Sequence, residues 1–400
     1  MKAADTGRIA ALDHIRGLSI LGILAVNAIG FAQPPEVYAD PAQSVLPLTH
    51  ADIVSWWLTE TFFHGKFITL FNLLFGISLY LVGRDDDPGQ RLVRRPLFRR
   101  LAWLSLFGLI HGALIWYGDI LLQYALIGFV FWRWRGETAR RLLTIGGLLF
   151  LGGAVILLFQ WFLPGPVDLP RPLDVTERIV VMRGDFSSLA GNATLWARGV
   201  IGDLIGYLPT TLGLMMLGLG LFKTDVLSGE GRTRVYLFML VAGAVSLVLI
   251  GWQSWVTLAQ GFPVPRMYGA YAIANTVLCL PVALGYASAL ILIGRSSLGQ
   301  RLLHPLVCAG RMAFTNYICQ SLIMTGLFYG GRLPHVFGLP HLLNLPWYGE
   351  MNHAALWPIV ITIWIAQLAF STLWLSRFRC GPLEWVWRCL TYDRRLPLRK

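Results

Sequence analysis

The stretch Gly108–Gly128, GLIHGALIWYGDILLQYALIG, decides the fold of this chain. Two apolar runs flank the pair Tyr117-Gly118, and a glycine between apolar runs favours a tight turn. Crossing the hydrocarbon core of a bilayer takes about 20 apolar residues in a helix, and each run with its neighbours approaches that length. The stretch therefore predicts two antiparallel membrane helices, over 101–116 and 119–132.

The rest of the chain repeats this pattern of apolar runs between short polar stretches. Hydrophobic residues make up 56% of the sequence and charged residues only 14%, which is typical of a protein surrounded mostly by lipid. The full set of runs is 15–33, 66–83, 101–116, 119–132, 142–163, 201–222, 235–256, 270–293, 305–328 and 355–376. We therefore expect an all-α integral membrane protein: a bundle of about ten transmembrane helices that forms a single domain over 1–400.

Lysine and arginine indicate how the bundle is oriented. Most of the 33 basic residues fall in alternate polar stretches, namely 1–16, 84–100, 133–141, 223–234, 294–303 and 377–400. Basic residues are retained on the cytoplasmic side of a membrane, so both termini are predicted to be cytoplasmic. The stretches 33–65 and 164–200 are then external loops, and 377–400 is a basic cytoplasmic tail. The net charge of +12 points to phospholipid head groups as partners and not to nucleic acid.

The external stretches contain two segments of their own. Residues 53–63 predict a short helix lying flat at the outer interface, with Trp56 and Trp57 as anchors. The amphipathic run 175–182 either covers an external opening or belongs to a solvated connection.

Polar residues inside the predicted spans are the candidates for function, because an ionisable group at mid-bilayer costs about 2.5–3.5 kcal/mol on insertion scales. In LDHIRG, Asp13 and Arg16 are three residues apart and predict an ion pair on one helix face. Asn27 returns to nearly the same face deeper in the membrane. This polar stripe is either a snorkelling pair with an interhelical amide or an anion site for a phosphate-bearing cytosolic ligand.

Two further segments carry polar groups into the bundle. His64 and Lys66 begin a helix at its external end, with Asn72 two turns deeper, and are either anchors or a polar mouth. In GRMAFTNYICQS, Arg311 could join Arg16 in binding phosphate. Asn316 and Gln320 share a helix face, and interhelical hydrogen bonding is the simpler role for both.

The opening stretch holds the most informative residue, His111. Positions equidistant from the turn share a depth, so His111 is predicted to lie level with Gln123 and Tyr124. Asp119 is either a cap at the start of its helix or part of the site. His111 is either a hydrogen-bonded core residue or a general base or proton relay, and in the functional interpretation Gln123 or Tyr124 orients its ring.

Metal and disulfide chemistry are not indicated. The five cysteines form no CxxC pair, and the eight histidines show no HxxxH spacing within one helix. We therefore expect no metal and no disulfide framework.

Five motifs together resemble the YeiB-like family of bacterial membrane proteins, a domain of unknown function. They are LDxxRG, GKFxxLFxLLFG, GxxHxxLxWxGDILxxYAxxG, GRMAxTNY and GPLEWxWR. The opening LDHIRG segment is also similar to transmembrane acyltransferases of the heparan-glucosaminide acetyltransferase kind, which pass an acyl group from cytosolic acyl-CoA to an acceptor across the membrane. His111 and Asp119 match the close family's pattern. His64 does not, although its external position is similar to that of the catalytic histidine in the distant relatives, so the identity of the catalytic histidine stays open.

These resemblances imply acyl transfer, most simply of acetyl from acetyl-CoA, in the bacterial inner membrane. The acceptor would be a hydroxyl or amine of an envelope glycan, lipid or exported metabolite. Arg16 and Arg311 would hold the CoA phosphates, Asn27 would lie along the path, and His64, Lys66 and Asp119 would line the external mouth. Two other classes remain open: a transporter whose His111 relays protons, favoured by broken helices at Pro209, Pro281 or Pro358, and a non-catalytic assembly partner. A homodimer is compatible with each of these functions.

Overall fold

The computed structural model describes residues 9–82, 94–162, 172–183, 185–263, 265–329 and 347–400, which form helices and no β-strand. The long helices are α1 (Ala10–Ala32), α4 (Lys66–Leu81), α5 (Arg94–Ile110), α7 (Ala139–Phe162), α9 (Asp185–Lys223), α10 (Thr233–Ala259), α11 (Tyr271–Gly294), α12 (Ser297–Arg311), α13 (Ala313–Phe328) and α15 (His353–Arg377). The shorter elements are α2 (Pro35–Ala39), η1 (Pro41–Gln43), α3 (His50–Phe62), η2 (His111–Ile115), α6 (Leu121–Phe131), η3 (Trp132–Trp134), α8 (Pro172–Arg183), η4 (Pro265–Ala270) and α16 (Pro382–Tyr392).

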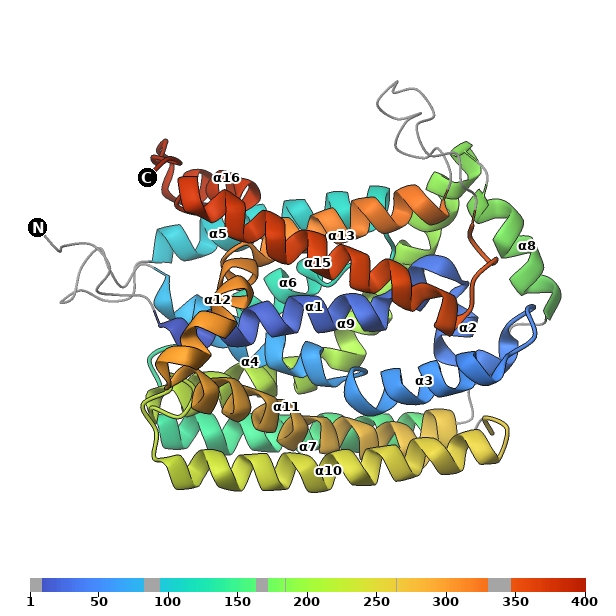
Figure 1. The fold of residues 1–400 in the computed structure, drawn as a ribbon, viewed down its shortest axis with the longest axis horizontal. Helices are drawn as coiled ribbons and strands as arrows, with labels where there is room; N and C mark the ends of the chain where they lie inside the picture. The colour runs from blue at the N-terminus through green and yellow to red at the C-terminus, as the bar shows by residue number, and fades with distance from the viewer. Residues whose placement is uncertain (1–8, 83–93, 163–171, 184, 264, 330–346) are drawn as a thin grey trace, which may run out of the picture.

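Most of the long helices run side by side along one direction, with α1 in the middle of the bundle and α12 crossing that direction at one end (Figure 1). Within the described residues, eight helical segments are long and apolar enough to cross a membrane. In α1, 78% of the most apolar stretch is buried, whereas in α10 only 28% is buried. Phe238, Val248 and Trp252 of α10 are each more than 60% exposed, which suits a helix that faces lipid. The fold is that of a multi-pass membrane protein.

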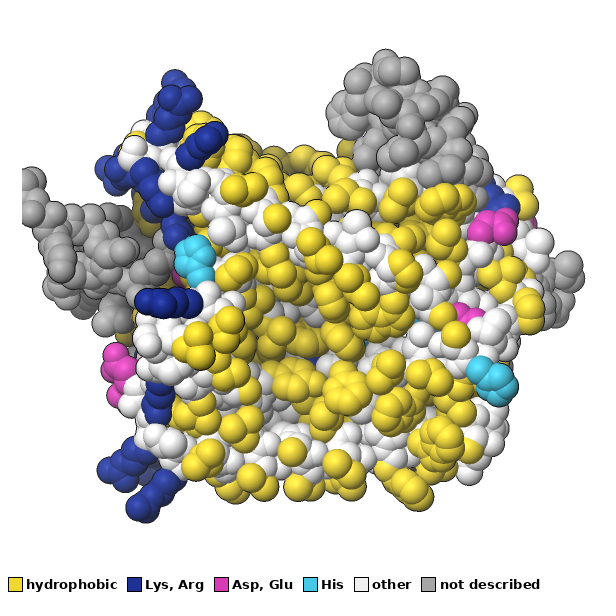
Figure 2. Space-filling view, viewed as in Figure 1, with side chains coloured by type: hydrophobic (Ala, Val, Ile, Leu, Met, Phe, Trp, Pro, Cys, Tyr) yellow, Lys and Arg dark blue, Asp and Glu magenta, His cyan; other side chains and the backbone are white. Residues whose placement is uncertain are grey.

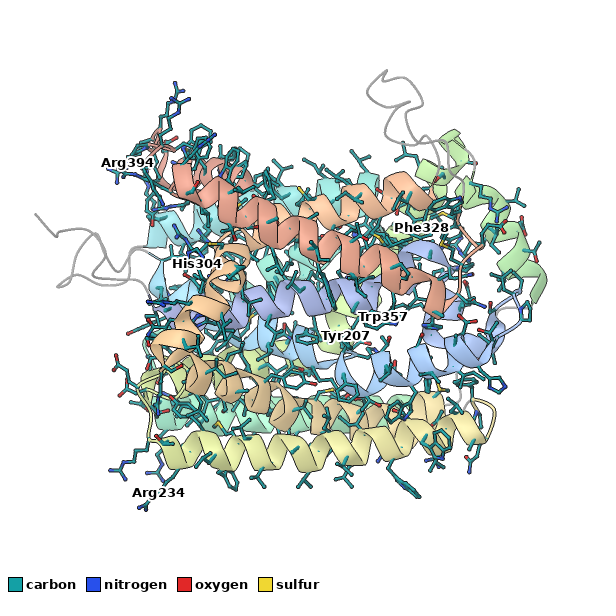
Figure 3. The ribbon with its side chains drawn as sticks, in the orientation of Figure 1. Tyr207, Arg234, His304, Phe328, Trp357 and Arg394 are labelled. Atoms are coloured by element: carbon teal, nitrogen blue, oxygen red, sulfur yellow. The ribbon has the colours of Figure 1, made fainter. Side chains whose placement is uncertain are left out.

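Basic side chains gather at one end of the bundle (Figure 2). Arg234, His304 and Arg394 lie at this end, where α1 begins and α16 ends (Figures 1 and 3). We call it the basic end, and the opposite end, over which α8 lies, the far end. The separation of charge along the bundle is the pattern that the positive-inside rule produces.

Two of the ten predicted spans take a different form. Residues 119–132 contain α6, a helix of 11 residues. Residues 305–328 fall in two helices, because the chain breaks at Met312 between α12 and α13. None of α6, α12 and α13 reaches the length of a complete span by itself. The count of ten crossings therefore stays a prediction. Pro209, Pro281 and Pro358 each lie inside a continuous helix and break none of them.

The predicted interfacial helix over 53–63 is wrong in its placement. Residues 50–62 do form a helix, α3, which begins with a reciprocal capping box between Thr49 and Asp52. However, Trp56 is only 3% exposed, and Trp57 donates a hydrogen bond from Nε1 to the carbonyl oxygen of Gly251 in α10 at 2.9 Å. Both indoles therefore pack within the protein instead of anchoring a surface helix.

The predicted external loop 164–200 is mostly helical where it is described. Its amphipathic run lies in α8, which buries Val175, Ile179 and Met182. These side chains join the hydrophobic cluster that contains Phe31 and Phe328 near the far end. Of the two alternatives for this run, the structure favours a cover over the end of the bundle.

Candidate functional site

Two glycines let α1 and α12 touch at the basic end. A Cβ atom added to Gly17 would lie 2.0 Å from a backbone oxygen of α12, and one added to Gly310 would lie 2.1 Å from a backbone oxygen of α1. Any other residue would push the two helices apart. Each glycine adjoins an arginine in the sequence, so this contact brings Arg16 and Arg311 to one place.

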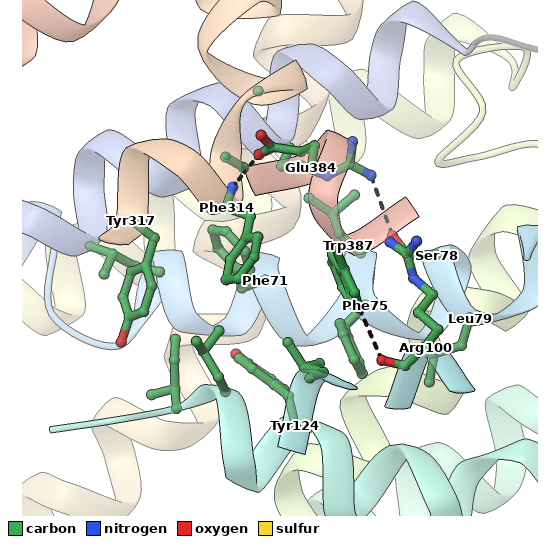
Figure 4. Close-up of a pocket in the computed structure, with 18 of the residues that line it drawn as sticks. Phe71, Phe75, Ser78, Leu79, Arg100, Tyr124, Phe314, Tyr317, Glu384 and Trp387 are labelled. Atoms are coloured by element: carbon green, nitrogen blue, oxygen red, sulfur yellow. Dashed lines mark hydrogen bonds between the residues drawn. The ribbon is translucent and has the colours of Figure 1, made fainter. Parts of the chain in front are cut away.

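Arg16 and Arg311 line a single cavity of about 200 Å³ (Figure 4). A third arginine, Arg100 of α5, lines it as well. The remaining polar lining comes from Ser78 of α4 and Glu384 of α16, and the indole of Trp387 closes one side. We call this space the basic cavity. It joins the two arginines that the sequence predicts for phosphate binding, and it adds a third.

The three guanidinium groups are held by defined contacts. Arg16 donates to Asp13 Oδ1 at 2.9 Å and to Ser78 Oγ at 3.3 Å, which confirms the predicted ion pair within LDHIRG. The guanidinium of Arg100 lies 3.8 Å from the ring centre of Trp387. Arg311 donates to the carbonyl oxygen of Arg379 at 2.8 Å. Three guanidiniums against the carboxylates of Asp13 and Glu384 leave an excess of positive charge, and the planar fork of arginine suits phosphate oxygens.

Glu384 is the carboxylate in this lining, and it also caps α13. Its Oε1 accepts hydrogen bonds from the backbone N–H groups of Phe314 at 2.7 Å and Thr315 at 3.0 Å. Its Oε2 accepts the hydroxyl of Thr315 at 2.5 Å. Burial raises the pKa of Glu384, and these three donors partly oppose that rise because they stabilise the ionised form. The cap fixes α16 against the start of α13 and so forms one wall of the basic cavity.

The inner end of the basic cavity is apolar and aromatic. Phe75 and Tyr124 have ring centres 5.1 Å apart, and Tyr317 lies across from them (Figure 4). The buried hydroxyl of Tyr124 has no hydrogen-bond partner among the described residues. Tyr317 connects the basic cavity with His111, because the centres of the two rings lie 5.1 Å apart.

His111 lies behind Tyr317 in a buried chain of three polar side chains. Its Nδ1 is 2.9 Å from Asp119 Oδ1, and its Nε2 is 2.8 Å from Ser321 Oγ. Asp119 also accepts the backbone N–H groups of Leu121 at 3.1 Å and Leu122 at 2.9 Å, so its carboxylate acts as an acceptor. In the neutral imidazole, Nδ1 then donates to Asp119, and Nε2 accepts a hydrogen bond from the serine hydroxyl. In this tautomer Nε2 can take a proton from Ser321.

This arrangement settles part of the open interpretation of Asp119. The residue caps the first turn of α6, as one interpretation predicts, and its carboxylate also contacts the ring of His111; a role in the site stays a prediction. Its side chain is 0% exposed, which contradicts a place at an external mouth. Gln123 and Tyr124 do not orient the imidazole as predicted, since Asp119 and Ser321 occupy both ring nitrogens.

A local change of helix type positions the imidazole. The chain winds as a π-helical turn, η2, directly after α5. Such a turn leaves carbonyl groups without their usual partners, and the side-chain amide of Asn192 in α9 donates to those of Gly112 at 2.9 Å and Ala113 at 3.0 Å. Asn192 is 0% exposed, so α9 fixes the turn that presents His111 to α13.

His64 and Lys66 lie apart from the basic cavity, in a separate cluster. Gly65 between them has a φ of +80°, a left-handed conformation that turns the chain from α3 into α4. His64 Nδ1 is 2.5 Å from Glu60 Oε1, and Lys66 Nζ donates to the carbonyl oxygen of Glu60 at 2.6 Å. Lys66 also reaches Asn275 Oδ1 at 3.4 Å. We call this group the Glu60 cluster.

The other predicted residues do not line the basic cavity. Asn27 is half-buried in α1, and Asn72 is buried in α4 with no partner for its side-chain oxygen among the described residues. Asn316 donates to Ser371 Oγ at 3.1 Å, and Gln320 donates to Gln367 Oε1 at 2.8 Å. The last two amides tie α13 to α15, as the simpler interpretation predicts.

Known proteins similar to this chain share nearly its whole length. "Uncharacterized protein YeiB" from Escherichia coli (strain K12) is 31% identical over 398 residues, which are 95% of this chain and 95% of the relative. This chain belongs to the YeiB-like family. "Uncharacterized protein YxaH" from Bacillus subtilis (strain 168) is 29% identical, over 98% of this chain and 96% of the relative. The family model described as "Protein of unknown function (DUF418)" matches residues 221–394. These descriptions state no activity, so the resemblance to acyltransferases stays a prediction.

The motifs that carry the YeiB-like resemblance supply most of the polar groups in the site. LDHIRG gives Arg16, GRMAFTNY gives Arg311, and GPLEWVWR gives Glu384 and Trp387. Sequence reasoning missed Glu384 and Trp387 because it treated the tail motif only as a mark of the family. It also missed Arg100 and Ser321, for which no local pattern exists: an arginine in a basic stretch and a serine in an apolar helix are both ordinary.

Proposed function

We propose that this protein is a transmembrane acyltransferase of the bacterial inner membrane. It takes an acyl group, most simply acetyl, from cytosolic acyl-CoA and gives it to a hydroxyl or amine at the external side. The acceptor belongs to an envelope glycan, lipid or exported metabolite. In this proposal the basic end is cytoplasmic, both termini are inside and the chain crosses the membrane ten times.

The basic cavity is the observation that carries this proposal. Its three arginines lie at the basic end, where a soluble phosphate-bearing donor would arrive. Its inner end is apolar and reaches Tyr317, which contacts His111. A ligand with phosphates at one end and a thin chain at the other matches a cavity that is basic at its outer end and apolar at its inner end. Acyl-CoA has that form, with the reactive thioester at the end away from its phosphates.

His111 would supply the proton chemistry. Nε2 accepts a proton during acyl transfer, and Asp119 holds the ring through Nδ1 and stabilises the positive charge that forms. The thioester lies on the cavity side of Tyr317, and the acceptor approaches from the far end. Transfer then moves the acyl group between the two sides without moving CoA.

Isothermal titration with acetyl-CoA tests the proposal directly. The full-length protein in detergent or nanodiscs should bind acetyl-CoA saturably at micromolar concentration. Pantetheine, which lacks the phosphates, should bind at least about tenfold more weakly, because it loses charge-assisted hydrogen bonds of about 1.5–3 kcal/mol each. If the heats for acetyl-CoA equal the heats of dilution, the protein does not bind this donor, and the proposed donor site is refuted.

A transporter is the second candidate, and interrupted helices favour it. The chain breaks between α3 and α4 beside Lys66, changes helix type at His111 and breaks after Arg311. Interrupted membrane helices with polar residues at the breaks are typical of transporter binding sites. Uptake of a labelled phosphate ester into proteoliposomes, together with no binding of acetyl-CoA, would favour transport over transfer.

A further inference from the structure

Ser321 stands out among the buried hydroxyl groups of the bundle. Its side chain is 1% exposed, and its Oγ lies closer to His111 Nε2, at 2.8 Å, than to the carbonyl oxygen of Tyr317, at 3.3 Å. Ser19 of α1 shows the more usual arrangement, in which the hydroxyl donates to the carbonyl oxygen four residues earlier, here at 2.7 Å. Ser321 keeps the corresponding contact to Tyr317 only at 3.3 Å and lies at 2.8 Å from the imidazole as well.

Ser321, His111 and Asp119 have the relation of a nucleophile, its base and the group that orients the base. The distances along the chain are 2.8 Å and 2.9 Å, both within hydrogen-bond range. Three different segments supply the members, namely α13, η2 and the turn before α6. Hydrogen-bond satisfaction of the neutral ring would need only one donor to Nε2 beyond the contact with Asp119, and any N–H group could provide it. A serine in this place adds a group that can be acylated.

We propose that Ser321 carries the acyl group between the two half-reactions as a covalent serine ester. This inference rests on the proposed acyl transfer and deepens it. Ser321 lies one helical turn after Tyr317, whose ring lines the basic cavity and covers His111. The donor thioester reaches Ser321 from the cavity when this ring turns aside. The acceptor later meets the ester from the other side of α13.

The chemistry balances without any further reagent. In the first half-reaction Oγ of Ser321 attacks the thioester carbonyl, its proton passes to Nε2 of His111, and the carbon–sulfur bond breaks. The thiolate takes that proton and leaves as free CoA. In the second half-reaction the acceptor hydroxyl or amine attacks the serine ester and gives its proton to Nε2. The bond from the acyl carbon to Oγ then breaks, and Ser321 recovers the proton.

The test is to trap the ester in the absence of acceptor. Purified full-length protein is incubated with acetyl-CoA labelled in the acetyl group, denatured and digested, and the labelled peptide is located by mass spectrometry. We expect one acetyl group on Ser321. Ser321→Ala should lose the label. Ser288→Ala, which removes an equally buried hydroxyl from α11, should keep it.

The Ser321→Cys variant is a control for the case in which Ser321→Ala loses the label because it does not fold. A thiol at this position should also take the acetyl group, and the resulting thioester should be cleaved by neutral hydroxylamine, to which the serine ester of the wild type is resistant. Saturable binding of acetyl-CoA with no label on the wild type or on Ser321→Cys would overturn the role of Ser321 and leave a direct transfer mechanism. Absence of acetyl-CoA binding would overturn the proposed function as well.

Discussion

The basic cavity and the Glu60 cluster both place charged side chains within the bundle, but they balance those charges differently. In the Glu60 cluster, Lys66 is 0% exposed, and the acidic Glu60 lies beside both His64 and Lys66. In the basic cavity, Asp13 pairs with Arg16, and the two other arginines share the space with the single carboxylate of Glu384. The charges of the Glu60 cluster compensate one another, whereas the basic cavity keeps an excess of positive charge.

Like charges held together oppose folding, and a protein retains such an arrangement mainly where a ligand uses it. We therefore interpret the Glu60 cluster as a structural ion cluster and the basic cavity as the candidate binding site, although the sequence marks both with the same kind of residue. It also favours His111, which adjoins the basic cavity through Tyr317, over His64 as the catalytic histidine.

The largest effect is expected from His111→Gln. Glutamine can still form hydrogen bonds in the space between Asp119 and Ser321, but it cannot accept a proton. The rate of acyl transfer should fall by about 10²- to 10⁴-fold, the usual contribution of a general base. CoA release from labelled acetyl-CoA measures this rate. His304→Gln, an exposed histidine at the basic end, should keep the wild-type rate. Equal rates for the two variants would assign the chemistry to another residue.

An intermediate effect is expected from Arg100→Gln. The dissociation constant for acetyl-CoA should rise by about 10- to 100-fold, because one charge-assisted contact to phosphate is lost. Titration calorimetry measures it. Arg99→Gln is the matched control, since Arg99 is the preceding residue and pairs with Asp393 at the surface at 2.7 Å. His64→Ala, in the Glu60 cluster, should also leave the constant unchanged. A rise for His64→Ala as large as that for Arg100→Gln would erase the distinction between the two regions.

The smallest effect concerns the one carboxylate of the basic cavity. Because burial raises the pKa of Glu384 above the ordinary 4.5, the folded protein binds a proton more tightly than the unfolded chain does. This contribution to stability is present at low pH and is lost as pH rises through the raised pKa. Glu384→Gln keeps an oxygen for the N–H groups of Phe314 and Thr315 but does not ionise.

Thermal midpoints of the wild type and Glu384→Gln should therefore coincide at acidic pH and diverge by a few degrees towards neutral pH, with the variant the more stable. The comparison is made at constant ionic strength, because screening changes the field of the nearby arginines. A gap that is independent of pH would mean that Glu384 acts only as a cap.

Sequence patterns were most informative where a single helix sets the geometry. The spacing of Asp13 and Arg16 predicts their ion pair, and the position of Asp119 predicts its cap. The spacing of Asn316 and Gln320 predicts a shared face, which they use to bind α15. Each of these depends on the repeat of one helix or on one turn.

What the sequence did not predict depends on contacts between helices. Ser321 meets His111 only because η2 and α13 pack in one register, and Arg100 reaches the cavity because α16 lies along α5. Trp56 looks like an interfacial anchor in the sequence, but it is 3% exposed and its ring packs against that of Phe262. Apolar composition shows that a helix is in a membrane protein, and it does not show which of its faces meets lipid.

The wall formed by Glu384 and Trp387 has a consequence for biosynthesis. Arg16 leaves the ribosome early, whereas α16 follows all other described helices in the chain. A nascent polypeptide therefore has no complete pocket until residues 382–392 have been translated and have docked. A ligand of the basic cavity therefore cannot assist the insertion of the earlier helices, and a stop codon anywhere before α16 yields a product that lacks this wall of the cavity.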